Sequence, residues 1–223
     1  MTGGSTGIGR ELVLALARRG VTVAASARSA SNLVELAALD KNIFPVPLDV
    51  TDRAAVAAAY ATIVKKFGTV DLAVLNAGTW DPMSAEDFDA MRAARSMDVN
   101  YGGITNALEV LMPAMIARKE GHIAMVASVA GYRGLPKAAG YAPSKAAVIS
   151  LAEALRFDLP RHNVDVSLIN PGFVDTPMTA VNDFPMPYII SADDAAQRIL
   201  DGLQRKKFEI AFPWQLVWSL KFL

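Results

Sequence analysis

The chain has 223 residues, 52% of them hydrophobic, and its 22 basic residues are balanced by 22 acidic residues. That length suits a single α/β domain with a substantial core, and the balanced charge provides no field that would recruit nucleic acid. The lack of cysteine excludes disulfides and thiolate catalysis, and with only two histidines we expect no metal site. Since neither a stretch of about 18 uncharged apolar residues nor a basic leader is present, we expect a cytoplasmic protein.

A glycine-rich turn with Gly3, Gly7 and Gly9 opens the chain and leads into a helix that Gly20 closes. Glycines let backbone amides approach a phosphate, and a helix N-terminus adds partial positive charge, although the turn could equally be a plain tight loop. Such a cradle normally follows a buried strand, and only Met1 and Thr2 stand before it. We therefore expect that residues precede Met1 in the natural protein and supply the missing first strand; the alternative is a fold that tolerates its loss.

Residues 21–27 form a predicted strand, and Arg28 follows it directly. In dinucleotide-binding folds the end of the second strand faces the adenosine ribose, where an acidic residue binds the 2′-hydroxyl of NAD and an arginine binds the 2′-phosphate of NADP. Arg28 therefore indicates NADP, with NAD less favoured. The alternative is an ordinary surface arginine.

Strands and helices then alternate: we predict a helix over 32–39, a strand over 43–48, a helix over 52–67 capped by Thr51 and ended by Gly68, and a strand over 70–75. This alternation predicts a Rossmann-type, doubly wound parallel sheet in a single domain spanning 1–223, here without its first strand. Ligands bind at the carboxyl ends of such strands, where Asp49, Asn76 and Ser128 stand.

The segment 121–145 contains the strongest candidates for chemistry. After an irregular to helical stretch over 80–95 and a long helix over 96–119 that carries Asn100, residues 123–127 form a strand that ends at Ser128. A helix with Pro143 in its first turn follows, and Tyr141 and Lys145 lie one turn apart on one face of it. A nearby ammonium favours the phenolate, so these groups could transfer a proton to or from a carbonyl or alcohol oxygen. The Tyr-x-x-x-Lys spacing by itself is weak evidence, because it also arises by chance.

The C-terminal part contains a predicted strand over 164–169, an apolar flap and helix over 177–206 that Ser191 caps, a strand over 208–212, and an apolar tail over 213–223. Read as a helix, the tail places Trp214, Val217 and Leu220 on one face. This face could pack on its own domain, form a dimer contact, or lie on a membrane surface. We favour a homodimer over the membrane.

Together these motifs resemble the short-chain dehydrogenase/reductase family, in its compact subgroup, over essentially the whole chain. The matching elements are Thr2-Gly3-x-x-x-Gly7-x-Gly9, Asp49, Asn76-Ala77-Gly78, Asn100, Ser128, Tyr141-x-x-x-Lys145 and Pro171-Gly172 with Thr176. The C-terminus departs from the Val-Asp-Gly-Gly-like strand that many members use in a tetramer, and it is more similar to the tails of steroid- and retinoid-type reductases.

The resemblance implies a role for each matching residue. Tyr141 would be the general acid/base, Ser128 would hold the substrate oxygen, Lys145 would lower the Tyr141 pKa and bind the nicotinamide ribose, and Asn100 would hold a proton-relaying water. The implied cofactor-binding residues are Gly3, Ser5, Gly7, Ile8, Gly9, Arg28, Asp49, Val50, Asn76, Ala77, Gly78, Tyr141, Lys145, Pro171, Gly172, Val174 and Thr176. Within this set, Asn76 to Gly78 would pack along the adenine ribose.

The function implied is hydride transfer between NADP(H) and a carbonyl or secondary alcohol. The predicted apolar pocket of Trp80, Tyr132, Leu135, Val174, Met178 and Phe184 indicates a small apolar substrate. One alternative is a non-catalytic NADP-binding sensor. Another is a protein that docks on a partner or a membrane surface through its tail.

Overall fold

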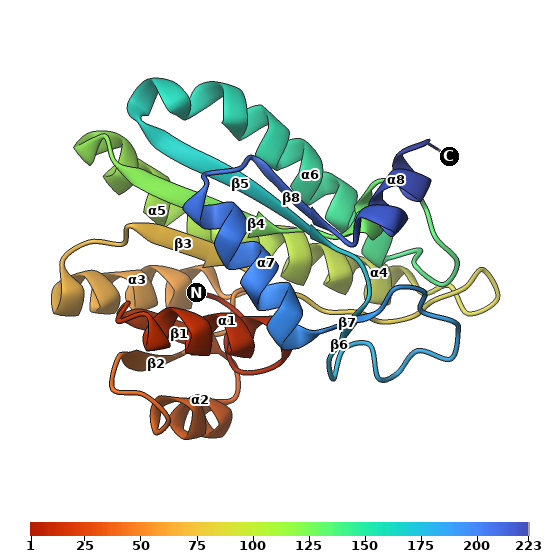
Figure 1. Ribbon diagram of the computed structural model, residues 1–223, viewed down its shortest axis with the longest axis horizontal. Helices are drawn as coiled ribbons and strands as arrows, with labels where there is room; N and C mark the ends of the chain where they lie inside the picture. Colours follow the sequence, from red (N-terminus) through yellow and green to blue (C-terminus); the bar gives the residue numbers. More distant parts are fainter. Residues whose placement is uncertain (223) are drawn as a thin grey trace.

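A parallel β-sheet with helices on both faces forms the centre of the molecule, as the alternating pattern predicts (Figure 1). The structure is a computed structural model that describes residues 1–222. The sheet strands are β1 (Val23–Ala27), β2 (Ile43–Pro47), β3 (Leu72–Leu75), β4 (Gly121–Val126), β5 (Val164–Pro171) and β8 (Glu209–Phe212).

The sheet consists of two blocks that one residue joins. Strand β1 pairs with β2, and β3, β4, β5 and β8 pair in that order, all in parallel. Thr2 forms single bridges to Ser26 of β1 and to Leu75 of β3, so it occupies the position between the blocks where the sequence lacks the expected first strand. The glycine-rich turn starts directly from this point.

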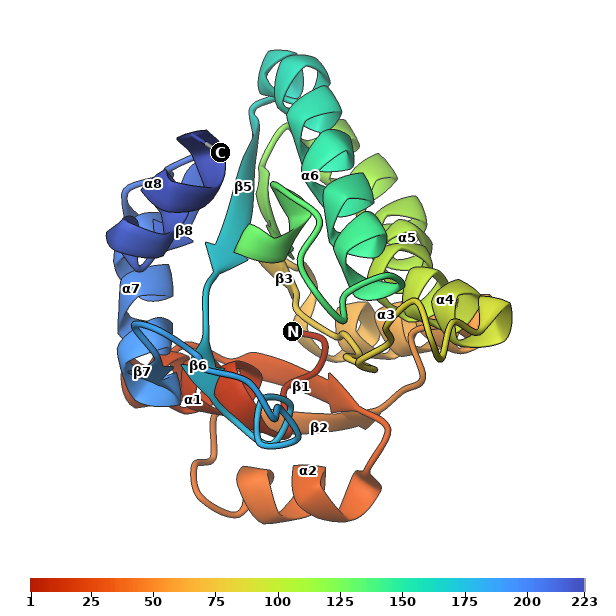
Figure 2. The same cartoon turned by 90° about the vertical axis from the view of Figure 1, so that its right-hand side faces the viewer.

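The helices form two layers (Figure 2). Helices α3 (Arg53–Phe67), α5 (Gly103–Arg118) and α6 (Tyr141–Asp158) cover one face of the sheet. Helices α1 (Gly7–Arg18) and α7 (Ala192–Gln204) cover the other, and α2 (Ala30–Ala37) packs beside β1 and β2. The remaining helices are α4 (Ala90–Met97) and α8 (Trp214–Phe222).

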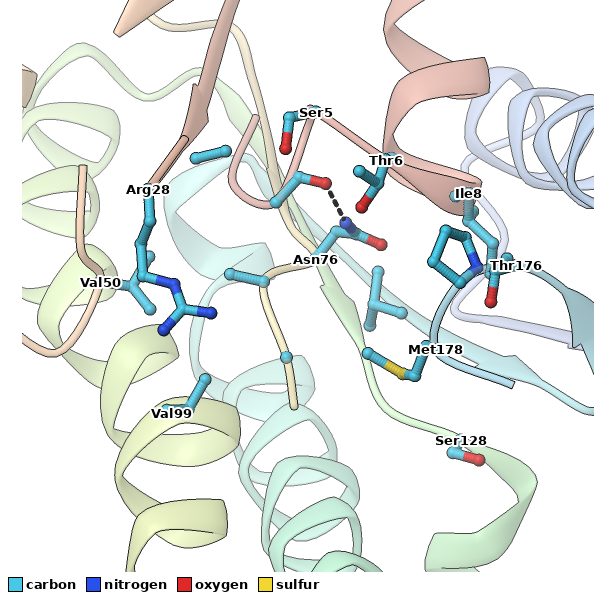
Figure 3. Close-up of a pocket in the computed structure, with 18 of the residues that line it drawn as sticks. Ser5, Thr6, Ile8, Arg28, Val50, Asn76, Val99, Ser128, Thr176 and Met178 are labelled. Atoms are coloured by element: carbon cyan, nitrogen blue, oxygen red, sulfur yellow. Dashed lines mark hydrogen bonds between the residues drawn. The ribbon is translucent and has the colours of Figure 1, made fainter. Parts of the chain in front are cut away.

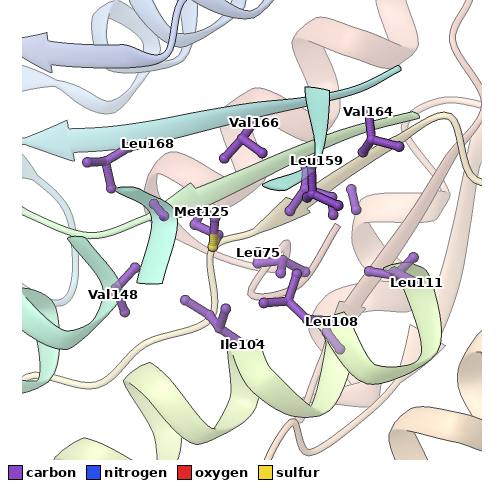
Figure 4. Close-up of a cluster of buried hydrophobic side chains, with 14 of the residues drawn as sticks. Leu75, Ile104, Leu108, Leu111, Met125, Val148, Leu159, Val164, Val166 and Leu168 are labelled. Atoms are coloured by element: carbon purple, nitrogen blue, oxygen red, sulfur yellow. The ribbon is translucent and has the colours of Figure 1, made fainter. Parts of the chain in front are cut away.

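The largest core cluster fixes α5 and α6 against the sheet (Figure 4). Ile104 and Leu108 of α5 and Val148 of α6 meet Met125 of β4 and Leu168 of β5, all of them buried. Residues spaced by four on a helix share one face, which explains how the apolar rhythm of these helices produces this contact. The packing holds the carboxyl ends of β4 and β5 in place.

Two helix starts differ from the sequence prediction. The helix predicted to begin at Ser96 begins at Ala90, because the Asp89 carboxylate caps it by accepting from the Met91 amide (2.7 Å). It continues through a π-helical turn, Asp98–Gly102, into α5. Helix α3 is capped by Asp52 rather than Thr51. Helix α6 begins at Tyr141, which agrees with the prediction that Pro143 lies in its first turn.

The predicted flap is an irregular segment between the short strands β6 (Val174–Asp175) and β7 (Ile190–Ser191), which pair with each other. Two polar side-chain contacts attach it to segments earlier in the chain. The Trp80 indole Nε1 donates to Asn182 Oδ1 (2.8 Å), and Lys137 forms an ion pair with Asp183 (2.6 Å). The Ser191 cap of the following helix is confirmed, since its hydroxyl accepts from the Asp194 amide (3.1 Å).

The tail forms α8 and packs on its own domain through Val217 and Leu220, which are buried against Val129. Trp214, the first residue of this helix, is 67% exposed and is therefore not part of the buried contact. Within residues 1–222, none of the helices is long and apolar enough to cross a membrane.

Candidate active site

A cleft of about 910 Å³ lies at the carboxyl ends of the strands, as expected for this fold (Figure 3). Every residue predicted to bind the cofactor lines this cleft, together with Ser128. Asn100 is buried and does not line the cleft. Residues from both sheet blocks and from the segment after β5 therefore meet in one place.

The glycine-rich turn leaves no room for side chains. A Cβ on Gly9 would lie 2.0 Å from the Gly3 carbonyl oxygen, and Gly3 has a positive φ of 64°. The turn leads into the N-terminus of α1, and within residues 1–222 the Thr6 side chain makes no capping bond to it. The first amides of α1 therefore remain available to an anion, and the turn fits a pyrophosphate.

Asn76 holds this turn in shape. Its side-chain Nδ2 donates to the carbonyl oxygens of Thr2 (3.2 Å) and Gly3 (3.0 Å), and the backbone amides of Asn76 and Ala77 donate to the Thr2 hydroxyl (3.0 and 3.1 Å). Figure 3 draws one hydrogen bond of the Asn76 side chain. The sequence predicted that Asn76 would contact a ribose. The structure shows that its side-chain amide bonds the glycine turn.

Arg28 extends into the cleft beside Val50 and Val99, at the opposite end from Ser128 (Figure 3). The nearby Asp49 accepts from the Thr51 amide (3.0 Å) and hydroxyl (2.8 Å). These two bonds, followed by the charges of Arg28 and Arg95, hold the Asp49 pKa below its usual range.

Sequence reasoning missed Arg95 and Val99, which also line this end of the cleft. Val99 could have been found, because it directly precedes Asn100. Arg95 could not, because the helix that carries it was predicted to start one residue later.

Lys145 is 3% exposed, and its Nζ donates to the Val126 carbonyl oxygen (2.9 Å) and lies 5.6 Å from the centroid of the Tyr141 ring. Burial lowers the pKa of Lys145 to about 8. The predicted convergence of Tyr141 and Lys145 is present, since α6 begins at Tyr141 and places Lys145 one turn later.

Burial raises the pKa of Tyr141 to about 12, and hydrogen bonding with Ser128 acts in the opposite direction. The sequence predicted a lowered pKa because of the Lys145 charge. That prediction was wrong for the protein alone, since desolvation of the phenol is the larger effect. The phenol is therefore protonated at neutral pH and can donate. The Trp80 ring packs edge-on against it, with centroids 5.0 Å apart.

The Ser128 hydroxyl lies at the end of β4, where it accepts from the Ala130 amide (3.1 Å) and donates weakly to the Pro171 carbonyl oxygen (3.4 Å). The long second bond leaves this hydroxyl able to exchange partners. It therefore can donate to an oxygen of a bound molecule.

Asn100 is fully buried in the π-helical turn and acts within the protein. Its Oδ1 accepts from the Thr79 amide (2.7 Å), and its Nδ2 donates to the Thr79 carbonyl (3.1 Å) and the Ser144 hydroxyl (2.9 Å). Ser144 in turn donates to the Tyr141 carbonyl (2.6 Å). The side chain thus positions the start of α6, and both of its amide protons are used in these internal bonds. The expected role of Asn100 in holding a water stays a prediction.

The predicted apolar pocket is only partly assembled. Val174 and Met178 line the cleft, and Trp80 lies against Tyr141. Tyr132 and Leu135 do not line the cleft; they pack against the cluster of Val129, Val217 and Leu220. Phe184 packs on Phe173, with ring centroids 6.1 Å apart.

Comparison with known sequences identifies relatives over nearly the whole chain. The sequence profile described as short chain dehydrogenase matches residues 1–184. An uncharacterized oxidoreductase of Myxococcus xanthus is 40% identical over 220 residues, covering 97% of this chain and 87% of the relative. A 3-oxoacyl-[acyl-carrier-protein] reductase of Thermotoga maritima is 34% identical over 219 residues, covering 90% and 87%.

Solved structures agree with this fold. A short chain dehydrogenase/reductase of Burkholderia phymatum in complex with NAD has a TM-score of 0.91 at 25% identity, over 99% of this chain and 90% of its own. A short chain dehydrogenase of Burkholderia cenocepacia in complex with NADP has a TM-score of 0.85 at 29% identity, over 96% and 87%. The chain belongs to the short-chain dehydrogenase/reductase family of oxidoreductases.

Proposed function

We propose that the protein transfers a hydride between NADP(H) and a small apolar carbonyl or secondary alcohol, with Tyr141 as general acid/base. The observation that carries this proposal is the meeting of Tyr141, Ser128 and Lys145 in one cleft with the glycine-rich turn and Arg28. Such a reaction needs the protein to supply a proton donor, a group that holds the substrate oxygen, a cation and a binding site for the cofactor phosphates.

The preference for NADP rests on Arg28. A planar guanidinium suits the 2′-phosphate, and no acidic residue follows β1 to bind a free 2′-hydroxyl. Gly3, Gly7, Ile8 and Gly9 would hold the pyrophosphate, and Pro171 to Thr176 would place the carboxamide. The nicotinamide ring, when bound, supplies or accepts the hydride.

In the reductive direction, the Tyr141 phenol donates its proton to the substrate oxygen while the Ser128 hydroxyl holds that oxygen. The Lys145 ammonium stabilises the phenolate that remains. The raised Tyr141 pKa means that the phenol is in its proton-donating form at neutral pH. Alcohol oxidation needs the phenolate and should accelerate as the pH rises.

The substrate end of the cleft supports a neutral substrate. Val174, Pro177 and Met178 line it, and none of these side chains carries a charge. Such a lining suits a hydrocarbon group next to the reacting carbonyl.

The test is a screen of ketones, aldehydes and secondary alcohols with NADP(H) and NAD(H), using the wild type and Tyr141→Phe. We expect Tyr141→Phe to lower turnover by about 10²–10⁴-fold, because only the transferable proton is removed. NADPH affinity should be nearly unchanged. Tyr60→Phe on α3, which packs on the core away from the cleft, is the matched control. Wild-type turnover in Tyr141→Phe would contradict the mechanism.

The same screen separates the enzyme from a non-catalytic sensor. A sensor would bind NADPH but turn over no compound of the panel.

A further inference from the structure

Glu209 of β8 joins three separate segments through one carboxylate. Its Oε1 accepts from the Tyr132 phenol (2.6 Å) and from Asn170 Nδ2 (3.1 Å), and its Oε2 accepts from Lys221 Nζ (2.5 Å). This carboxylate lies outside the cofactor cleft, and the proposed mechanism does not use it.

Two of these partners are connected to the two hydrogen bonds of Ser128. Tyr132 directly follows η2 (Val129–Gly131), a 3-10 helix of one turn, whose Ala130 amide donates to the Ser128 hydroxyl. Asn170 directly precedes Pro171, whose carbonyl oxygen accepts from that hydroxyl. Glu209 therefore holds both of the segments that position the Ser128 hydroxyl.

The third partner belongs to α8, which covers η2 from outside. Val217 and Leu220 pack on Val129, and Lys221 Nζ lies 4.9 Å from the centroid of the Tyr132 ring. The tail thus fixes both the carboxylate and the turn that the carboxylate holds.

The charges around Glu209 keep its hydrogen bond to Tyr132 formed at neutral pH. Burial would raise the Glu209 pKa, but Lys221, Tyr132 and Asn170 together hold it below its usual value. Burial and the Glu209 carboxylate raise the Tyr132 pKa, so the phenol remains a donor. The Tyr132–Glu209 bond therefore persists at neutral pH.

We propose that Glu209, held by Lys221, is a positioning residue that aims the Ser128 hydroxyl at the reacting oxygen by fixing η2 and the end of β5. The consequence for catalysis rests on the proposed function, because it requires that Ser128 binds the substrate. The effect on the structure of the Ser128 segment does not depend on the proposed function.

The first experiment measures amide hydrogen exchange by mass spectrometry on the full chain. In Glu209→Gln, we expect the peptide spanning 127–133 to exchange about tenfold faster than in the wild type. Lys221→Met, on the surface of the tail, should act in the same direction more weakly. Asp165→Asn is the control, because it breaks an ion pair with Lys206 (2.8 Å) at the other end of β5. Unchanged exchange over 127–133 in a folded Glu209→Gln would overturn the proposal.

The second experiment is a double-mutant cycle on turnover. We expect Glu209→Gln to lower kcat about tenfold while NADPH affinity is kept, and to have no further effect once Ser128→Ala is present. Additive losses would show that Glu209 does not act through Ser128 and would overturn the proposal. If the wild type turns over no carbonyl, the proposed function fails, and the exchange experiment still decides the positioning role.

Discussion

At the scale of single residues, burial drives Tyr141 and Lys145 toward their neutral forms, since it raises the pKa of the phenol and lowers that of the ammonium. Within residues 1–222, a backbone carbonyl rather than a carboxylate holds the Lys145 ammonium. A buried cation with so weak a partner destabilises the fold, so its presence points to catalysis rather than stability.

Lys145→Met should abolish turnover and stabilise the protein without cofactor. The lowering of the Lys145 pKa from 10.5 to about 8 corresponds to an unfavourable free energy of about 3 kcal/mol for burying the charge, which the substitution removes. Losing the hydrogen bond to Val126 costs the variant about 1 kcal/mol. The net gain of about 2 kcal/mol should raise Tm by about 4–8 °C at pH 7.

The pH dependence of this gain follows from linkage. Between pH 8 and 10.5 the unfolded chain binds more protons than the folded one, so wild-type stability rises with pH in that window. The Tm difference between wild type and variant should therefore shrink from pH 7 to pH 10. Exposed Lys65→Met is the control, and a lower Tm for Lys145→Met at pH 7 would disprove this account.

Arg28→Ala should change cofactor preference. Losing a charge-assisted contact to the 2′-phosphate should weaken NADPH binding by about 1.5–3 kcal/mol, or roughly ten- to hundredfold. NADH binding should be nearly indifferent. Dissociation constants from cofactor fluorescence would measure both, with Arg53→Ala outside the cleft as a control of equal charge. Tighter binding of NADH than NADPH by the wild type would refute the assignment.

At the scale of elements, the α1 N-terminus and its turn form the anion cradle, and its geometry depends on close backbone approach. In Gly9→Ala, the new Cβ would meet the Gly3 carbonyl oxygen at 2.0 Å, so the turn must shift. We expect about hundredfold weaker binding of both dinucleotides. Gly134→Ala, where a Cβ meets nothing within 4 Å, is the matched control for titration calorimetry. Equal affinities in the two variants would exclude the turn from the binding site.

Element boundaries depend on contacts that local pattern does not reveal. Helix α4 starts earlier than the mixed polarity of its sequence indicates, because the Asp89 carboxylate accepts from the free amides of the first turn. The resulting register brings Arg95 into the cleft and buries Asn100 in the π-helical turn.

At the scale of the whole molecule, the homodimer expected from the sequence stays a prediction. Helix α8 exposes Trp214 (67%), Trp218 (57%) and Phe222 (76%), and Trp218 stacks on Phe222 with centroids 5.0 Å apart. An exposed aromatic surface of this kind suits a protein contact.

Changing Trp214 and Trp218 together to serine should convert a dimer into a monomer of 23.8 kDa in sedimentation analysis. Val217, Leu220 and Lys221 are kept in this variant, so α8 should stay folded on its domain. A wild-type monomer, or a variant with unchanged mass, would remove the tail from any interface.

Four features could be predicted from the sequence alone: the order of strands and helices, the parallel sheet, the glycine turn, and the placement of Tyr141 and Lys145 on one helix face. These features follow from local periodicity and from fixed spacings along the chain. Together with the family resemblance, they pointed to many of the residues that line the cleft, but not to Arg95 or Val99.

The contacts of the side chains follow from the tertiary structure. Burial raises the Tyr141 pKa, Asn76 and Asn100 form internal bonds, the Tyr132 phenol bonds Glu209 outside the cleft, and Glu209 is thereby connected to the Ser128 segment. Each of these outcomes depends on desolvation or on a hydrogen bond between residues far apart in the chain. Such effects have no periodic signature in sequence, because they arise only when separate elements pack together.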